Sequence, residues 1–172
     1  MQEVKIFGYD ELFVGQSANF SREVTNEMLE SFRALSGDEN PLHSDENFAK
    51  ASGFKSRVVY GMLTASLYSC LTGVYLPGKY CFLHSVRADF LSPVFVGDIL
   101  TCEAKIIEKR DLFQQIVIKA YIRNQDGKKV SRAIIEAGVK KKWGGVAREQ
   151  IFIFGRVFGN MFGVYPAACV AG

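Results

Sequence analysis

The sequence predicts an α+β fold in which an antiparallel sheet of about five or six strands wraps around one long central helix. Two patterns support this prediction. Residues 61–76 are mostly apolar, with small residues among them, and Pro77 follows, which is typical of a buried helix. After this proline, apolar residues alternate with polar ones, which is typical of strands with one buried face. A sheet must bury its apolar face against another element, and the apolar helix is the available partner.

The first predicted elements precede the central helix. Residues 16–24 are a short strand candidate. Thr25 then precedes an amphipathic run at helical spacing, and Gly37 is placed to end it, so we expect a helix of about three turns. Residues 38–58 contain turn formers, charges and one short apolar stretch. We expect this segment to be a loop with a single helical turn.

Most of the predicted strands follow the central helix. Residues 86–91 are a short candidate, and the turn at residues 95–98 opens a longer strand. Apolar positions then alternate with polar ones in three runs, at residues 100–106, 116–122 and 133–139. Asp126-Gly127 lies between the last two runs and predicts a hairpin.

Composition limits the class of protein. The chain has 172 residues, of which 48% are hydrophobic and 23% charged, so it can form a globular domain with an adequate core. Its net charge is only +3 and its basic residues are scattered, which disfavours nucleic acid as a partner. The four cysteines show no metal-binding spacing, and the first residues lack the apolar core of a signal peptide. We therefore expect a cytoplasmic protein without disulfides.

The stretch with the clearest chemical potential is residues 36–43, Ser-Gly-Asp-Glu-Asn-Pro-Leu-His. It places the carboxylate of Asp38 five residues before His43, one of two histidines in the chain. Pro41 between them disfavours a continuous helix, so we expect both side chains to project from a bent loop. A carboxylate and an imidazole that hold one water can remove a proton from it and deliver a proton elsewhere. The stretch therefore predicts acid–base chemistry on water.

Three motifs, in this order and spacing, resemble those of a known family. They are residues 36–43, residues 58–63 (Val-Val-Tyr-Gly-Met-Leu) and residues 90–98 (Phe-Leu-Ser-Pro-Val-Phe-Val-Gly-Asp). Together they resemble the MaoC-like (R)-specific enoyl-CoA hydratases, hot-dog-fold proteins also called hydratase 2 type. The resemblance covers roughly residues 10–142. It implies syn addition of water to a trans-2-enoyl thioester, which gives an (R)-3-hydroxyacyl-CoA, and the reverse dehydration.

The resemblance also implies roles for individual residues. Asp38 and His43 would bind the catalytic water, and the backbone N–H of Gly61 would face the thioester carbonyl. The start of a helix suits the second role, because its first N–H groups are unpaired and its dipole favours negative charge. Ser69 would lie near the site. We group Asn40 with these substrate-binding candidates and expect its side chain to brace the loop by hydrogen bonds.

Further expectations concern the substrate and its carrier. Lys55 and Arg57, just before the central helix, are candidates for contacts with the phosphates of coenzyme A. The acyl length depends on the pocket beside the central helix, for which Tyr60, Leu67 and Leu83 are candidates. The resemblance implies a homodimer without a metal or redox cofactor. Coenzyme A enters only as the carrier of the substrate, and an acyl carrier protein is the alternative carrier.

Several alternatives stay open at the level of sequence. A hot-dog acyl-CoA thioesterase would drive water onto the thioester carbon rather than onto C3. A non-catalytic subunit that binds acyl thioesters would need neither Asp38 nor His43. Asp45 and Glu46 raise the alternative of a metal site, which the lack of a second histidine at ligand spacing disfavours. The sequence does not decide which of Asp38 and His43 is the acid and which is the base.

Residues 143–172 do not fit the predicted domain at residues 1–142. Residues 151–172 contain almost no charge, and glycines recur in them every four residues, as in packed membrane helices. However, an arginine, an asparagine and a proline interrupt this stretch, and such residues are costly in lipid. We expect an apolar appendage that packs on the domain or on a partner. Membrane association through residues 151–172 is the disfavoured alternative.

Overall fold

The computed structural model describes residues 3–140, so the predicted appendage at 143–172 lies outside the described residues. The domain boundary at residue 142 stays a prediction. The elements in chain order are η1 (Tyr9–Glu11), β1 (Ser17–Glu23), α1 (Asn26–Ser36), α2 (Pro41–Ser44), α3 (Glu46–Ala51), α4 (Gly61–Cys70), η2 (Leu71–Tyr75), β2 (Cys81–Phe90), β3 (Ile99–Arg110), η3 (Asp111–Phe113), β4 (Gln115–Arg123) and β5 (Lys129–Val139).

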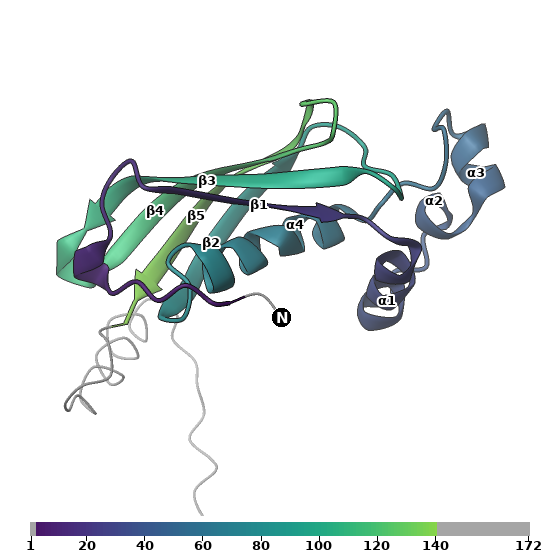
Figure 1. The fold of residues 1–172 in the computed structure, drawn as a ribbon. Coiled ribbons are helices and arrows are strands. Elements are labelled where there is room, and N and C mark those ends of the chain that lie inside the picture. The colour runs from purple at the N-terminus through teal and green to yellow at the C-terminus, as the bar shows by residue number, and fades with distance from the viewer. Residues whose placement is uncertain (1–2, 141–172) are drawn as a thin grey trace, which may run out of the picture. The chain divides into compact units, whose positions relative to one another are not determined.

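The strands form one antiparallel sheet, as predicted, and their order in it is β1-β3-β4-β5-β2 (Figure 1). Buried residues lie opposite one another in the central strands, for example Cys102 opposite Ile122 and Ile106 opposite Ile118. The predicted hairpin joins β4 to β5, and Gly127 adopts the positive φ of 73° that such a turn requires. The edge strand β2 begins at Cys81 rather than at Val86. Its first residues are mostly exposed and do not alternate between buried and exposed positions, so the sequence pattern did not reveal them.

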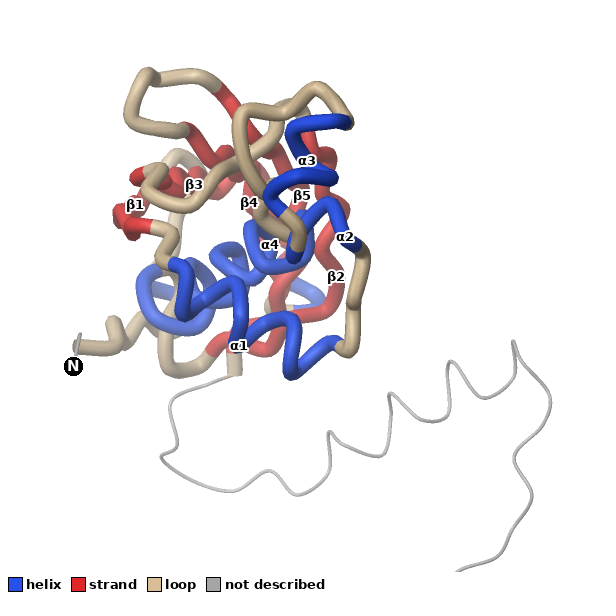
Figure 2. Tube along the Cα trace, turned by 90° about the vertical axis from the view of Figure 1, so that its right-hand side faces the viewer, coloured by secondary structure: helices blue, strands red, loops and turns tan. Residues whose placement is uncertain are grey.

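Helix α4 lies against one face of the sheet, which curves around it (Figures 1 and 2). Leu63 and Leu67 of this helix belong to the same buried cluster as Ile118 of β4. The buried hydroxyl of Tyr68 donates a hydrogen bond to Ser131 of β5 at 2.9 Å. The helix continues as the π-helical turn η2 and ends before Pro77, so the predicted central helix is confirmed.

One face of α4 is less buried than predicted. Met62, Ser66 and Ser69 lie at successive helical turns, and all three side chains are exposed. The reason is that the curved sheet covers only one side of the helix in a single chain (Figure 2). These three residues form an exposed stripe on α4, although the helix sequence is mostly apolar. Another surface can therefore still cover this side of the helix.

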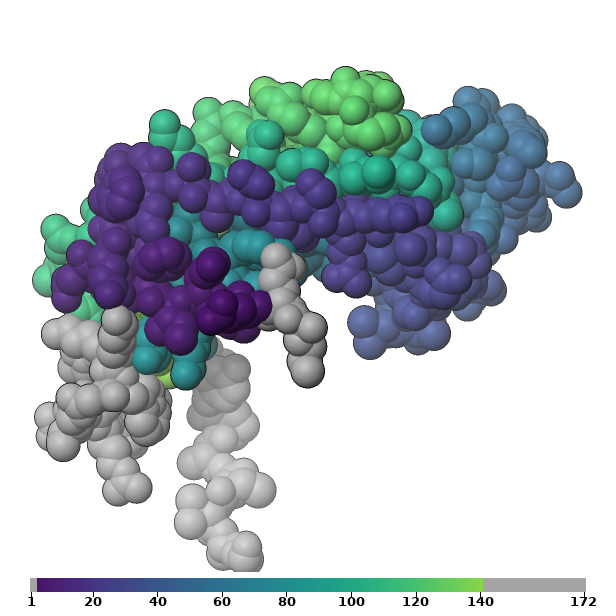
Figure 3. Space-filling model, in the orientation of Figure 1, coloured from purple at the N-terminus to yellow at the C-terminus, as the bar shows by residue number. Residues whose placement is uncertain are grey.

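Helix α1 is formed as predicted. The Thr25 side chain caps it by accepting the N–H of Met28, and Gly37 ends it with a φ of 70°. The N–H of Gly37 donates to the carbonyl of Arg33 at 2.9 Å. Figure 3 shows α1, α2 and α3 gathered as one blue to violet surface at one end of the sheet.

Residues 38–58 contain two short helices rather than the loop with one helical turn that we predicted. Pro41 is the first residue of α2, where its missing N–H leaves no helical bond unmade. Asn40 and Asp45 are the N-caps of α2 and α3, and each side chain accepts backbone N–H groups of the helix that follows. Helices of four and six residues are too short to show a helical period in the sequence.

No helix within residues 3–140 combines the length and the apolar character that crossing a membrane requires. The predicted membrane alternative for residues 151–172 lies outside the described part of the chain.

Candidate active site

The two predicted water-binding residues, Asp38 and His43, lie in the segment that directly follows α1. Asp38 directly follows Gly37, so it stands on a loop as expected. His43, in contrast, lies within α2, and the prediction that it projects from a loop is wrong. The physical reason is that Pro41 does not only interrupt a helix here but begins a new one.

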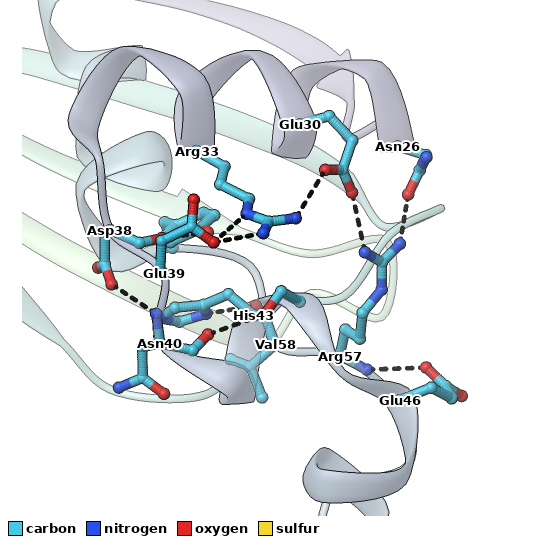
Figure 4. A network of polar contacts seen from close by, with 12 residues as sticks. Asn26, Glu30, Arg33, Asp38, Glu39, Asn40, His43, Glu46, Arg57 and Val58 are labelled. Carbon is cyan, nitrogen blue, oxygen red and sulfur yellow. Dashed lines mark hydrogen bonds and ion pairs between the residues drawn. The ribbon is translucent and has the colours of Figure 1, made fainter.

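Asn40 connects these two residues through its backbone. Its N–H donates to Oδ1 of Asp38 at 3.1 Å, and its carbonyl accepts the N–H of His43 at 3.0 Å (Figure 4). Its side-chain oxygen accepts the N–H of Leu42 at 2.9 Å. The expected brace is therefore present, and the Asn40 side-chain oxygen is used to cap α2.

The imidazole of His43 is oriented by its contact with Val58. Nδ1 lies 2.6 Å from the carbonyl oxygen of Val58 (Figure 4). A carbonyl oxygen can only accept a hydrogen bond, so Nδ1 carries the hydrogen. In the neutral ring the lone pair then belongs to Nε2. The contact therefore fixes the tautomer in which Nε2 can accept a proton.

Tyr60 contacts both members of the pair. Its hydroxyl donates to the backbone carbonyl of Asp38 at 2.8 Å, and its ring lies against His43 with the ring centroids 4.0 Å apart. Burial, with the nearby negative charge of Asp38, raises the pKa of Tyr60, so the hydroxyl stays protonated as a donor. We expected this residue to line an acyl pocket, and the structure shows that it contacts Asp38 and His43.

Gly61, the predicted oxyanion donor, is the first residue of α4. Tyr60 precedes it and gives the helix no side-chain cap. A Cβ atom at Gly61 would lie 3.2 Å from the ring of Phe90 on β2, which is tighter than ordinary contact. Glycine is therefore favoured here by the close approach of a neighbouring strand.

Within residues 3–140, the remaining predicted site residues, Ser69, Arg57 and Lys55, form no hydrogen bond or ion pair with Asp38 or His43. Ser69 is exposed on α4, about 12 Å along the helix from Gly61 at the usual rise per residue. The guanidinium of Arg57 bonds to Glu30 at 2.9 Å and also to Asn26, both on α1 (Figure 4). The ammonium of Lys55 lies 4.3 Å from the centroid of the Phe95 ring.

An ion-pair network that the sequence did not reveal joins α1 to the segment with the candidate pair. Arg33 binds Glu39, the neighbour of Asp38, and lies 3.6 Å from Glu30. Glu30 in turn binds Arg57 at 2.9 Å (Figure 4). Glu30 and Arg33 are one helical turn apart on α1, so their pairing follows from the sequence once α1 is predicted. The contact of Glu30 with Arg57 joins residues 27 positions apart, and no sequence period indicates it.

The carboxylates that raised the alternative of a metal site have other partners. Asp45 caps α3, and Glu46 pairs with Lys50 at 3.0 Å and accepts the N–H of Arg57. Over residues 3–140, no three His, Cys, Asp or Glu side chains gather in a way that could hold a metal ion.

A crevice too narrow to hold a water molecule lies between α4 and the sheet. It is lined by Arg22, Val24, Met28, Val59, Leu63, Thr64, Leu67 and Leu100. Leu67, one of the acyl-pocket candidates, is buried and lines this crevice. Leu83, another candidate, is 39% exposed on the edge strand β2.

Known proteins resemble this chain in both sequence and fold. Residues 13–127 match the family described as MaoC like domain. An (R)-specific enoyl-CoA hydratase of Aeromonas caviae is 43% identical over 100 residues, which are 58% of this chain and 75% of that protein. A 3-hydroxybutyryl-CoA dehydratase of Methylorubrum extorquens is 31% identical over 108 residues, which are 63% and 69% of the two chains. The unliganded R-hydratase PhaJ1 of Pseudomonas aeruginosa superposes with a TM-score of 0.76 at 30% identity, over 84% of this chain and 96% of that one.

Proposed function

The chain belongs to the MaoC-like domain family and has the hot-dog fold that its sequence predicted, and from this premise we propose that it is an (R)-specific enoyl-CoA hydratase. The reaction is syn addition of water to a trans-2-enoyl thioester, and its reverse is the dehydration of an (R)-3-hydroxyacyl thioester. The observation that carries the proposal is the pair Asp38 and His43, joined through Asn40, with the free lone pair of His43 on Nε2.

The proposed proton transfers follow from this tautomer. Nε2 of His43 accepts one proton of the water while its oxygen bonds to C3 and the double-bond electrons move toward the thioester. The imidazolium then returns this proton to C2, so one proton is taken up and one is delivered. The Asp38 carboxylate accepts a hydrogen bond from the second hydrogen of the water and so orients the water; this hydrogen stays on the oxygen and becomes that of the 3-hydroxyl group. Because one ring nitrogen handles both steps, hydroxyl and hydrogen add to the same face.

The start of α4 is the proposed partner of the thioester oxygen. Negative charge develops on this oxygen as water adds to C3. The N–H of Gly61 belongs to the first turn of α4, where the helix dipole favours negative charge. Asn40 then supports the site as a brace of Asp38 and His43, and Ser69 lies farther along α4 as a substrate contact.

The reaction with crotonyl-CoA tests this function. We expect the absorbance of the conjugated enoyl thioester to disappear without release of free thiol. Free thiol would instead identify a thioesterase, and no change with any enoyl thioester would leave a non-catalytic binding subunit. The same assay with crotonyl acyl carrier protein shows which carrier the protein prefers, and we propose coenzyme A.

We also propose that a second copy of the chain pairs with β2. Leu83, Val86 and Phe90 of this edge strand lie opposite buried residues of β5, yet they are 39%, 37% and 50% exposed. Met62 on the exposed stripe of α4 is 65% exposed. An unpaired edge with apolar side chains favours pairing with another strand.

Light scattering tests this pairing. It should give the mass of a dimer for the wild type and the mass of a monomer for Val86→Lys, and a monomeric wild type would contradict the pairing.

We propose that neither a metal nor a redox cofactor takes part and that the protein works in the cytoplasm. The argument against a cofactor is chemical, because adding water to an enoyl thioester needs only proton transfers and no net oxidation. Activity should therefore survive chelation with EDTA and appear in the cytoplasmic fraction of cells. Loss of activity that a divalent metal restores would contradict the first proposal, and recovery in the membrane fraction would contradict the second.

A further inference from the structure

We propose that Tyr60 is a positioning residue that holds Asp38 and His43 in one fixed arrangement, an inference that rests on the proposed function. The hydroxyl of Tyr60 donates to the backbone carbonyl of Asp38 at 2.8 Å. Its ring packs on the imidazole of His43 at a centroid distance of 4.0 Å. One side chain therefore touches both members of the pair without being either the acid or the base.

Tyr60 is well suited to this role because it is itself firmly held. Only 2% of its surface is exposed, whereas Asp38 is exposed and His43 is partly exposed. Its ring also lies against Phe32 of α1, with the ring centroids 5.1 Å apart. Its backbone is the N-cap of α4, directly before Gly61. Tyr60 thus links the end of α1, the candidate pair and the proposed oxyanion donor.

The hydrogen bond of Tyr60 controls geometry rather than charge. It ends on the main-chain carbonyl of Asp38, and the carboxylate of Asp38 accepts the N–H of Asn40 instead. Burial and the charge of Asp38 raise the pKa of the hydroxyl, so it remains a donor at neutral pH. Loss of the hydroxyl should therefore leave substrate binding intact and disturb the alignment of the water. A lower kcat with an unchanged KM is the expected signature.

The kinetic test compares Tyr60→Phe and Tyr60→Leu with the matched variant Tyr9→Phe. The hydroxyl of Tyr9 also donates at 2.8 Å, to Asp111, at the other end of the sheet. We expect Tyr60→Phe to lower kcat about fivefold with crotonyl-CoA and with longer enoyl-CoA esters alike, since it removes one hydrogen bond. Tyr60→Leu should lower kcat about 100-fold, because it removes the ring contact as well. Tyr9→Phe should keep the kcat of the wild type.

A structural readout separates this inference from the proposed function. The chain has two histidines, so the Cε1–H region of a ¹H–¹³C spectrum should show two signals, one from each ring, and His84→Gln assigns them. The ring current of Tyr60 should shift the His43 signal, and Tyr60→Leu should abolish this shift while Tyr60→Phe retains it. The His84 signal should stay in place in both variants.

The possible outcomes are distinct. A wild type that hydrates no enoyl thioester refutes the proposed function, while the spectra still report on the contact with His43. An active wild type with an unchanged kcat in Tyr60→Phe overturns the positioning role, and so does a His43 signal that Tyr60→Leu leaves unmoved. A rise in KM that grows with acyl length would also overturn it, because that result indicates a pocket-lining residue. If Tyr60→Leu does not fold, Tyr60→Phe alone decides.

Discussion

The sheet with α4 and the segment of residues 26–57 are built from different interactions. The sheet and α4 share one apolar cluster, in which Ile106, Ile118 and Ile135 are fully buried. In residues 26–57, by contrast, only Leu29 and Ala49 are buried. That segment is held by helix caps, backbone hydrogen bonds and ion pairs, and it carries both members of the candidate pair.

This difference indicates that most of the stability resides in the sheet and α4, whereas both members of the candidate pair reside in residues 26–57. Apolar burial contributes most of the folding free energy, whereas an exposed ion pair is worth about 1 kcal/mol or less. A substitution in the sheet should therefore act mainly on unfolding. A substitution in residues 26–57 should act mainly on turnover, and the predictions below test this separation.

Asp38→Asn should give the largest effect, a loss of about 10³-fold in kcat, because the amide can no longer accept hydrogen bonds from the water as a charged group does. The melting temperature should stay within about 2 °C, since Asp38 is exposed and the amide oxygen can still accept the N–H of Asn40. Steady-state kinetics and thermal melts measure both quantities. The matched variant Glu39→Gln, one residue away, should keep kcat within about threefold. Equal losses in the two variants would refute a special role for Asp38.

Ile118→Ala should have the opposite effect. It removes a fully buried side chain of β4 and should lower the free energy of unfolding by about 2–5 kcal/mol, while kcat well below the melting temperature stays near the wild-type value. Urea unfolding followed by circular dichroism measures the loss. Lys119→Ala, at the exposed neighbouring position, should change stability by about 0.5 kcal/mol or less. A large loss of kcat in folded Ile118→Ala would contradict the separation.

Arg57→Gln sharpens the comparison, because it tests how much the ion-pair network matters to the site. It breaks the contact with Glu30 and should lower kcat about fivefold with little loss of stability. The effect should be the same for crotonyl-CoA and for the crotonyl thioester of N-acetylcysteamine, which carries no phosphate. An effect confined to the coenzyme A ester would instead support the phosphate contact that we predicted from the sequence for Arg57.

The smallest effect concerns the pH dependence of stability at the far end of the sheet. Burial and the hydrogen bond to Asp111 raise the pKa of Tyr9 from 10.0 to about 12. Because the pKa is higher in the folded state, the stabilisation is complete below pH 10 and is lost as the pH rises from 10 toward about 12. Comparing urea unfolding of wild type and Tyr9→Phe should show a stability difference that shrinks across this range. A constant difference would contradict the assignment.

The same contrast explains how much the sequence could predict. The alternation in residues 100–106, 116–122 and 133–139 predicted β3, β4 and β5 correctly, because each strand buries one face in a common core. Helices α2 and α3 escaped prediction because short exposed helices leave no periodic pattern. Asp38 and His43 could be chosen as candidates from their chemistry and from a family resemblance.

The contacts around the candidate pair could not be predicted. The bond from Tyr60 to the Asp38 carbonyl joins residues 22 positions apart, and it uses a backbone atom that every residue type possesses. The contact from Val58 to His43 is likewise made by a main-chain oxygen. Such contacts depend on where α1 and α4 are placed by the sheet, so they become visible only in the folded chain.

The stereochemistry of hydration in D₂O tests the central claim most directly. If His43 takes a proton from the water and returns it to C2, the hydrated product of crotonyl-CoA should be the (R)-3-hydroxyacyl ester with deuterium and hydroxyl on the same face. NMR of the product gives the relative configuration of the two centres, and NMR of an ester with a chiral acid gives the absolute configuration of the hydroxyl group. Deuterium on the opposite face would contradict an account in which one imidazole nitrogen moves the proton, and an (S)-hydroxyl group would contradict the proposed (R)-specificity.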